Sequence, residues 1–171
     1  MTTTLTRERA DLLQALQKHR DFLRYTVRDL SDEQAGASPT ASQLCLGGII
    51  KHVAAVESGW GDFIRRGPSA MASSDQDWTE GDWFSGFRML PTETLALLLE
   101  HYGEVAAHTD ELVATLPSLD SDQPLPQAPW FEQNARWSAR RVFLHIIAET
   151  VQHAGHADII RETLDGQKTM G

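Results

Sequence analysis

Four long stretches of this sequence carry apolar side chains at helical spacing, and this pattern restricts the chain to a helical fold. Within each stretch apolar residues recur every three or four positions, which places them on one face of an α-helix. The stretches cover residues 6–30, 42–66, 91–116 and 138–164. A helix with one apolar face must bury that face against another element. Four such helices in one chain predict an all-α four-helix bundle with long loops between helices.

Helix-breaking residues separate these stretches. The breakers expected to end helices are, in chain order, Gly36, Pro39, Gly67, Pro68, Pro117 and the Asp165-Gly166 pair. Ser31 with Gln34 can cap one short turn at most, and Thr92 and Ser138 are the expected caps of the third and fourth helices. We find no segment with the alternating pattern of a strand, and we therefore predict no sheet.

The length and net charge of the chain exclude several classes of protein. The 171 residues suffice for one core, so we expect a single domain over residues 1–171. No run approaches the roughly 18 apolar residues of a membrane span, and no signal peptide is recognisable. Cys45, the one cysteine, excludes an internal disulfide and fits a reducing compartment, so we expect a cytoplasmic protein with no membrane partner. The net charge of -9, with basic residues scattered, argues against nucleic acid as a partner.

The segment HIIAETVQHAGHADII, residues 145–160, places polar side chains on the face that its aliphatic residues define. At about 100° per residue, Glu149, His153 and His156 project side by side over two turns. An ionised glutamate in an apolar seam costs several kcal/mol unless it is paired, neutralised or bound to a cation. A carboxylate and an imidazole four residues apart can bind one divalent metal ion.

The third ligand of such a site is expected from the second helix. The segment GGIIKHVAAVESGW places His52 at the edge of the apolar stripe, and Gly47 and Gly48 leave space for a neighbouring helix or a ligand. His52, Glu149 and His153 would then bind one ion and leave an open coordination position, as in catalytic zinc sites. Nickel also suits this ligand set.

Other interpretations of these residues stay open at this point. His52 could be a hydrogen-bonded core histidine, and Glu149 with His153 could be an acid/base pair without metal. His145 and His156 could each be a fourth ligand, a residue that orients a ligand, or a general base. The glutamate could also pair with Arg140, Arg141 or Arg161 through another helix.

These motifs together resemble the DinB-like superfamily. The segments LGGIIKHVAAVESGW and SARRVFLHIIAETVQHAGHADIIRETLDG, with the acidic and aromatic loop between them, carry the resemblance over nearly the whole chain. The chain is most similar to an actinobacterial branch of unknown function. The superfamily also includes YfiT-like hydrolases and the N-terminal domain of mycothiol-dependent maleylpyruvate isomerase.

The resemblance implies a four-helix bundle, often a homodimer, with a divalent metal ion bound by one residue of the second helix and two of the fourth. Those positions correspond to His52, Glu149 and His153. Many relatives have histidine in place of Glu149, whereas the isomerase type has glutamate there. His156 stands where many relatives carry glutamine. The chain has no counterpart of the isomerase's C-terminal domain, so isomerase activity is not implied.

The resemblance also suggests thiol chemistry. A low-molecular-weight thiol such as mycothiol or bacillithiol would bind the metal as its thiolate and attack a small electrophile. His156 or His145 would move a proton, and the loop from Trp78 to Phe87 would cover the apolar part of the substrate. One alternative is a hydrolase in which the metal activates water. Another is a non-catalytic, metal-stabilised bundle that dimerises or binds a partner.

Overall fold

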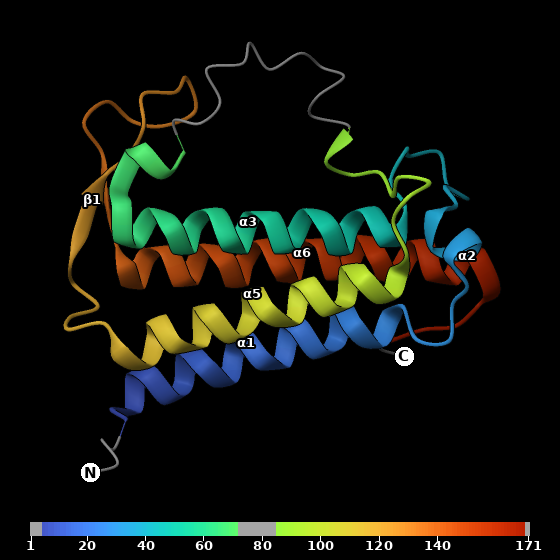
Figure 1. Ribbon diagram of the computed structural model, residues 1–171, viewed down its shortest axis with the longest axis horizontal. Coiled ribbons are helices and arrows are strands. Elements are labelled where there is room, and N and C mark those ends of the chain that lie inside the picture. The colour runs from blue at the N-terminus through green and yellow to red at the C-terminus, as the bar shows by residue number, and fades with distance from the viewer. Residues whose placement is uncertain (1–4, 72–84, 170–171) are drawn as a thin grey trace.

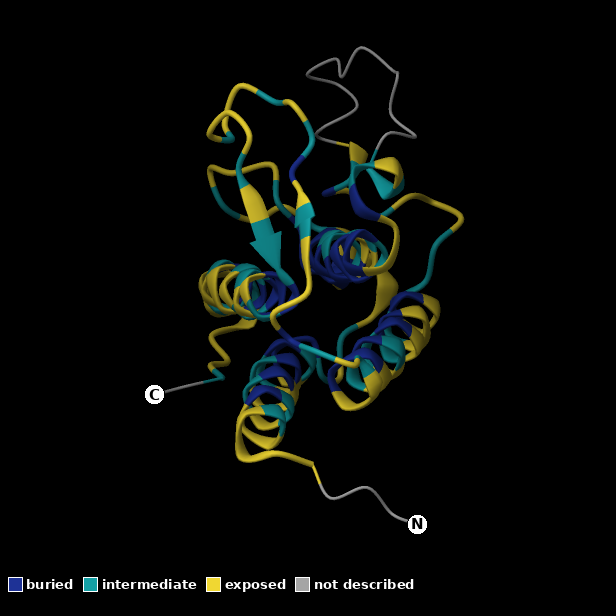
Figure 2. Cartoon of the chain, turned by 90° about the vertical axis from the view of Figure 1, so that its left-hand side faces the viewer, coloured by how far each residue is buried: buried dark blue, intermediate teal, exposed yellow. Residues whose placement is uncertain are grey.

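Four long helices dominate the computed structural model, which describes residues 5–71 and 85–169 (Figure 1). They are α1 (Arg7–Thr26), α3 (Leu46–Arg66), α5 (Leu95–Thr115) and α6 (Ala139–Asp165). Helix α3 packs against α5 and α6, and α1 packs against the same two helices. Seen from one end, the buried side of each long helix faces the centre (Figure 2). The predicted all-α bundle is confirmed.

Helices α3 and α6 are neighbours in the bundle and run antiparallel to each other. Helices α1 and α6 run one way along the bundle, and α3 and α5 run the other way (Figure 1). The short helix α2 (Asp32–Gly36) joins α1 to α3, and its capping box from Ser31 and Gln34 matches the single turn expected there. A 3₁₀ turn, η1 (Gly67–Ala70), follows α3 at the predicted stop.

Helix α6 begins at its predicted cap, whereas α1 ends earlier than its apolar pattern indicated. Ser138 accepts a hydrogen bond from the N–H of Arg141 and starts α6. The predicted end of α1 near Leu30 is wrong, because Asp29 adopts a positive φ of 58° and turns the chain. The Arg161 guanidinium donates to the carbonyl oxygens of Thr26 and Arg28, at 2.7 and 2.8 Å, and so takes the place of further helical hydrogen bonds.

Helix α3 begins at Leu46, four residues later than predicted. The Thr40 hydroxyl accepts from the N–H of Ser42, and the Ser42 hydroxyl accepts from the N–H of Leu44. Such local side-chain bonds compete with helix formation. Cys45 is the actual cap, and its sulfur accepts from the N–H of Gly48 at 3.3 Å.

Helix α5 likewise begins later than expected. Thr94, not the predicted Thr92, caps it by accepting from the N–H of Leu97. The Glu93 carboxylate accepts from the N–H of Leu90 and closes a turn before the helix.

A small hairpin between α5 and α6 contradicts the prediction of no sheet. Strands β1 (Asp122–Pro124) and β2 (Arg136–Ser138) are antiparallel, with Gln123 opposite Trp137. Strands of three residues are too short for an alternating pattern to be recognised. The two-stranded sheet has only edges, so Pro124 is tolerated without its N–H.

The core consists of two apolar clusters with a polar layer between them. One cluster includes Leu16, Phe63, Leu112 and Phe143, and the other includes Leu23, Ile50, Tyr102 and Ile160. Between them lie Arg20 and Glu57, which are 2% and 0% exposed.

The two charged residues of this layer are held by hydrogen bonds between helices. The Arg20 guanidinium donates to both carboxylate oxygens of Glu57 on α3 and to Asp110 on α5. This network was not predicted from the sequence, although Arg20 stands in the apolar stripe of α1 between Leu16 and Leu23. No described helix combines the length and hydropathy that a membrane crossing requires.

Candidate metal centre

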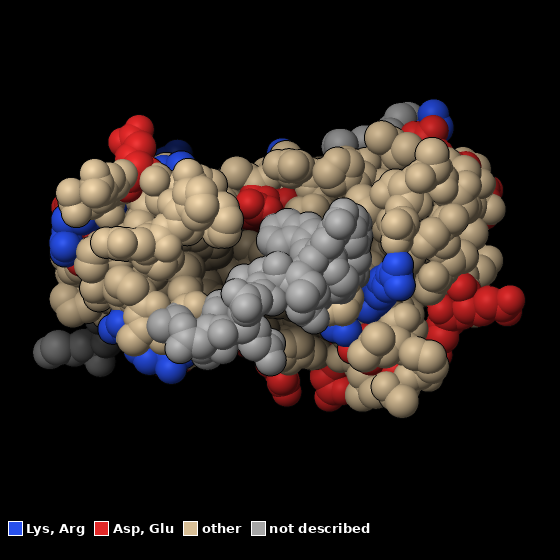
Figure 3. All heavy atoms as spheres, turned by 90° about the horizontal axis from the view of Figure 1, so that it is seen from above, with Lys and Arg blue, Asp and Glu red and all other residues tan. Residues whose placement is uncertain are grey.

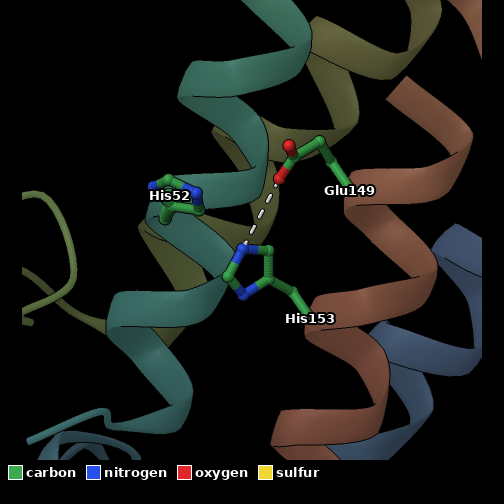
Figure 4. A group of neighbouring side chains, drawn as sticks. All are labelled: His52, Glu149 and His153. Carbon is green, nitrogen blue, oxygen red and sulfur yellow. Dashed lines mark ion pairs between the residues drawn. The ribbon is translucent and has the colours of Figure 1, made fainter. Parts of the chain in front are cut away.

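Three side chains from α3 and α6 meet where these helices pack against each other. His52 on α3 and Glu149 and His153 on α6 point toward one another (Figure 4). Each offers a ligand atom within 4.8 Å of the other two, and the rings of His52 and His153 have centroids 4.7 Å apart. Three ligands that hold one ion at 2.0–2.2 Å in tetrahedral geometry lie roughly 3.3–3.8 Å from one another. The side chains would therefore close in by about 1–1.5 Å at most to bind one ion.

His153 has the surroundings expected of a metal ligand. It is 7% exposed, and its Nδ1 has no hydrogen-bond partner among the described residues. Its Nε2 lies 3.6 Å from Glu149, which is too long for a hydrogen bond. Buried polar atoms are otherwise almost always hydrogen-bonded. Burial, and next to it the ring of His156, lowers the pKa of His153 to about 4. The imidazole is therefore neutral at pH 7 and has a free lone pair.

His52, like His153, has a pKa that is lowered by burial. Burial, and to a smaller extent the neighbouring His153, lowers its pKa to about 4, so this imidazole too is neutral at pH 7. The two neutral imidazoles and one carboxylate are a donor set that suits zinc or nickel. The residues present thus fit a divalent ion.

Glu149 lies at the edge of the apolar seam and not deep inside it. Its side chain is 28% exposed, and burial raises the pKa of its carboxyl group. The Glu149 carboxylate is therefore only partly desolvated, and its burial costs less than the sequence led us to expect. The Glu149 carboxylate lies 3.5 Å from Nε2 of His145 and 3.6 Å from Nε2 of His153.

Among the described residues, Glu149 forms none of the pairings with Arg140, Arg141 or Arg161 that the sequence left open. Arg140 pairs with Glu8 and Asp120, and Arg161 pairs with Asp165. These carboxylates lie outside the group of three metal-ligand candidates.

The two other histidines of α6 flank the group of three without belonging to it. The Nε2 of His145 approaches Glu149, and its ring lies 4.8 Å from the ring of Trp60. His156 is on the other side, with its ring 5.4 Å from that of His153, and its buried Nδ1 has no hydrogen-bond partner in the part of the chain that the structure describes. His145 is thus next to the carboxylate, and His156 is next to an imidazole.

Phe87 covers His52, and a glycine allows this contact. The two rings stack with centroids 3.8 Å apart, and Cys45 Sγ donates to the carbonyl oxygen of Phe87 at 3.7 Å. A Cβ at Gly48 would lie 1.8 Å from that same oxygen. The space predicted beside the glycine pair is therefore filled by the chain's own backbone.

Of the aromatic loop that was expected to cover the substrate, Phe87 can be placed beside the site. Trp78 and the other aromatic residues of that loop, Trp83 and Phe84, lie outside the described residues. Seen from above, the surface of the protein has a hollow with acidic side chains at its rim (Figure 3).

An aromatic cluster at the hairpin end of the site was not recognised from the sequence. Trp60 on α3 and Trp137 on β2 stack with centroids 4.8 Å apart, and Phe131 lies against both. His145 contacts both tryptophans. The sequence contains one indication of this cluster, which is the equal spacing of two tryptophans from two histidines. Trp60 follows His52 by eight residues, and Trp137 precedes His145 by eight.

Comparison with known proteins points to one family. A family model described as Mycothiol-S-transferase matches residues 11–166. Among solved structures, the crystal structure of a conserved protein from Enterococcus faecalis is similar with a TM-score of 0.68, over 91% of this chain and 96% of that chain. The two sequences are 13% identical, so this likeness establishes the fold alone. No curated protein matches the chain.

Proposed function

We propose, since this chain belongs to the mycothiol-S-transferase family, that it transfers a low-molecular-weight thiol to a small electrophile with the help of a divalent metal ion. The family is DinB/YfiT-like, as the sequence motifs predicted. The proposed metal dependence rests on one observation: the ligand atoms of His52, Glu149 and His153 lie within 4.8 Å of one another. Mycothiol is the proposed thiol, and bacillithiol is the alternative.

His52, Glu149 and His153 would hold the ion, with zinc as the first choice and nickel as the second. Three protein ligands leave a coordination position open, as in catalytic and not structural zinc sites. When bound, such an ion lowers the pKa of a thiol at that position and so supplies a nucleophile at neutral pH.

His145 is the proposed proton acceptor. Its Nε2 lies 3.5 Å from Glu149, and its side chain is 23% exposed, so it is adjacent to the site and can pass a proton to solvent. Burial, with Arg141 as a smaller cause, lowers its pKa, which leaves the ring neutral and able to accept. In the proposed reaction the thiol S–H bond breaks and His145 takes the proton. A carbon–sulfur bond then forms, and the leaving group departs with its electron pair.

His156 is the alternative proton acceptor. It touches His153 and not the carboxylate, and its Nδ1 is buried, which leaves it less suited to exchange protons with water. His145→Gln should therefore reduce thiol transfer more than His156→Gln.

The protein is also proposed to form a homodimer through the outer face of α6. Large apolar side chains stand exposed on this face at helical spacing, namely Leu144, Val151 and Ile159. Exposed Ala148 and Gly155 lie between them and would let a second helix approach closely. Light scattering should give a dimer mass for the wild type and a monomer mass for Val151→Asp.

The metal site is tested by elemental analysis of protein purified without added metal. We expect about one equivalent of zinc or nickel in the wild type and its loss in His52→Ala. His101→Ala is the matched control, because His101 is an exposed histidine of α5 outside the site. Equal metal content in both variants would contradict the assignment.

The reaction is tested with the model electrophile monobromobimane. We expect its consumption to depend on added mycothiol and to be lost in His153→Ala. Ester cleavage without thiol would favour the hydrolase instead. A metal-dependent melting temperature without either activity would favour a non-catalytic bundle.

A further inference from the structure

We propose that the hairpin end of this site binds the electrophile, and that the favoured substrates combine a flat apolar body with an anionic group such as a carboxylate. This inference rests on the proposed S-transfer and adds the chemical class of the substrate. The residues that carry it are Trp60, Trp137 and Arg141, none of which belongs to the proposed metal ligands.

The direction in which a bound electrophile extends follows from the packing at the two ends of the group of three. At one end Phe87 stacks on His52, and the backbone of residue 87 lies directly against Gly48. That end is filled by protein. At the other end His145 is 23% exposed and lies between Glu149 and the aromatic cluster. The body of a substrate attacked near the ligands therefore extends toward the hairpin.

The surface available in that direction is aromatic. Trp60 and Trp137 both contact the ring of His145, with centroid distances of 4.8 and 5.1 Å. Trp60 is buried and stacks on Trp137, so the partly exposed Trp137 is the one of the two that a ligand can reach. Phe131 lies 5.8 Å from Trp137. Aromatic side chains offer large apolar contact areas with preferred ring geometries. A flat apolar or aromatic group is the ligand that such a surface suits.

Arg141 adds a positive charge to the same end. The residues Arg141, His145 and Glu149 follow one another at four-residue spacing, so they share one face of α6. The backbone positions of Arg141 and Glu149 lie about 12 Å apart along the helix axis. The guanidinium carbon of Arg141 sits 4.3 Å from the centroid of the Trp137 ring. A guanidinium placed over an aromatic ring can still bind a carboxylate side-on through its N–H edges.

The positive charge of Arg141 can bind a ligand, whereas that of the neighbouring Arg140 is neutralised by carboxylates of the protein. Arg140 pairs with Glu8 and Asp120, whereas no ion pair of the Arg141 guanidinium occurs within residues 5–71 and 85–169. The protein carries a net charge of -9, which repels anions generally. A cation that lies over an aromatic ring, without an ion pair among the described residues, is therefore a local feature that selects an anionic ligand.

The test compares para-(bromomethyl)phenylacetate with its methyl ester as electrophiles. In either reaction the thiol sulfur bonds to the bromomethyl carbon, the carbon–bromine bond breaks, bromide leaves, and the thiol proton passes through His145 to solvent. We expect the wild type to have the higher kcat/KM for the carboxylate. In Arg141→Gln the ratio of the two kcat/KM values should fall about tenfold. Arg140→Gln, the matched control, should keep the wild-type ratio.

A binding measurement separates this inference from the proposed function. The unreactive analogue para-tolylacetate is titrated by calorimetry into metal-loaded wild type, Arg141→Gln and Arg140→Gln. We expect the Kd to rise about tenfold in Arg141→Gln alone. Equal Kd values in the three proteins would overturn the inference. If neither bromide is consumed in a thiol-dependent way, the proposed function fails, and the Kd values still decide whether Arg141 binds the anion.

Discussion

The contact between Gly48 and residues 87–88 predicts a large effect of adding one methyl group. In Gly48→Ala the new Cβ would lie 1.8 Å from the carbonyl oxygen of Phe87 and 2.3 Å from its carbonyl carbon. Real Cβ atoms essentially never come within 3.0 Å of another atom, and both neighbours are backbone. The segment must therefore move away by roughly 1 Å, and the stacking of Phe87 on His52 cannot persist.

The size of the effect follows from what this movement removes. Phe87 is 9% exposed, and complete burial of a phenylalanine side chain contributes about 1.5–3 kcal/mol. The hydrogen bond from Cys45 to Phe87 adds about 0.5 kcal/mol. Replacing glycine by alanine inside a helix stabilises the helix by about 1 kcal/mol, which offsets part of this loss. The net loss is about 2 kcal/mol, which lowers the Tm of a chain of this size by about 4–8 °C.

The assay is thermal unfolding followed by circular dichroism at a fixed metal concentration. Gly59→Ala on the same helix is the control, because nothing lies within 4 Å of a Cβ built there. That variant should be more stable than the wild type by about 0.5–1 kcal/mol. If Gly48→Ala melts as high as Gly59→Ala, the close packing over His52 is not present in solution, and the reasoning is refuted.

Three further predictions concern the polar layer, the cap of α6 and the metal. Arg20→Met leaves Glu57 buried without a partner and should cost about 3–5 kcal/mol, whereas Glu57→Gln should cost less, because Arg20 keeps Asp110. Urea unfolding measures both, and the reverse order would contradict the assignment. Ser138→Ala should lower the urea midpoint by the equivalent of about 1 kcal/mol without a change in m, and an unchanged midpoint would show that the cap is unimportant. Metal at about 100 times its Kd should stabilise the wild type by about 2.7 kcal/mol, seen as a Tm increase that a chelator removes, and should not stabilise His153→Ala.

Helix content could be predicted because it depends on neighbours in sequence. The apolar spacing identified the four long helices, and both ends of α6 followed from local signals, Ser138 and the Asp165-Gly166 pair. The end of α1 could not be predicted, because its last carbonyl groups bond to Arg161, which lies 135 residues away from Thr26. The hairpin was missed because three-residue strands leave no pattern.

The candidate metal ligands could be grouped for a similar reason. Glu149 and His153 are one helical turn apart, and His52 stands at the edge of the stripe that faces α6. The environment of the group could not be predicted. The stacking of Trp60 on Trp137 and the contact of Gly48 with Phe87 join segments whose relative positions are set by the path of the loops.

The buried pair of Arg20 and Glu57 also determines how the helices align along their length. Leucine surfaces tolerate sliding, since one apolar contact replaces another. If α1 slid by one turn, about 5.4 Å, both charges would enter apolar surroundings without a partner, at a cost of several kcal/mol. Buried polar residues select one alignment of coiled-coil helices in the same way. A bundle with leucine at both positions could remain stable and yet sample shifted alignments.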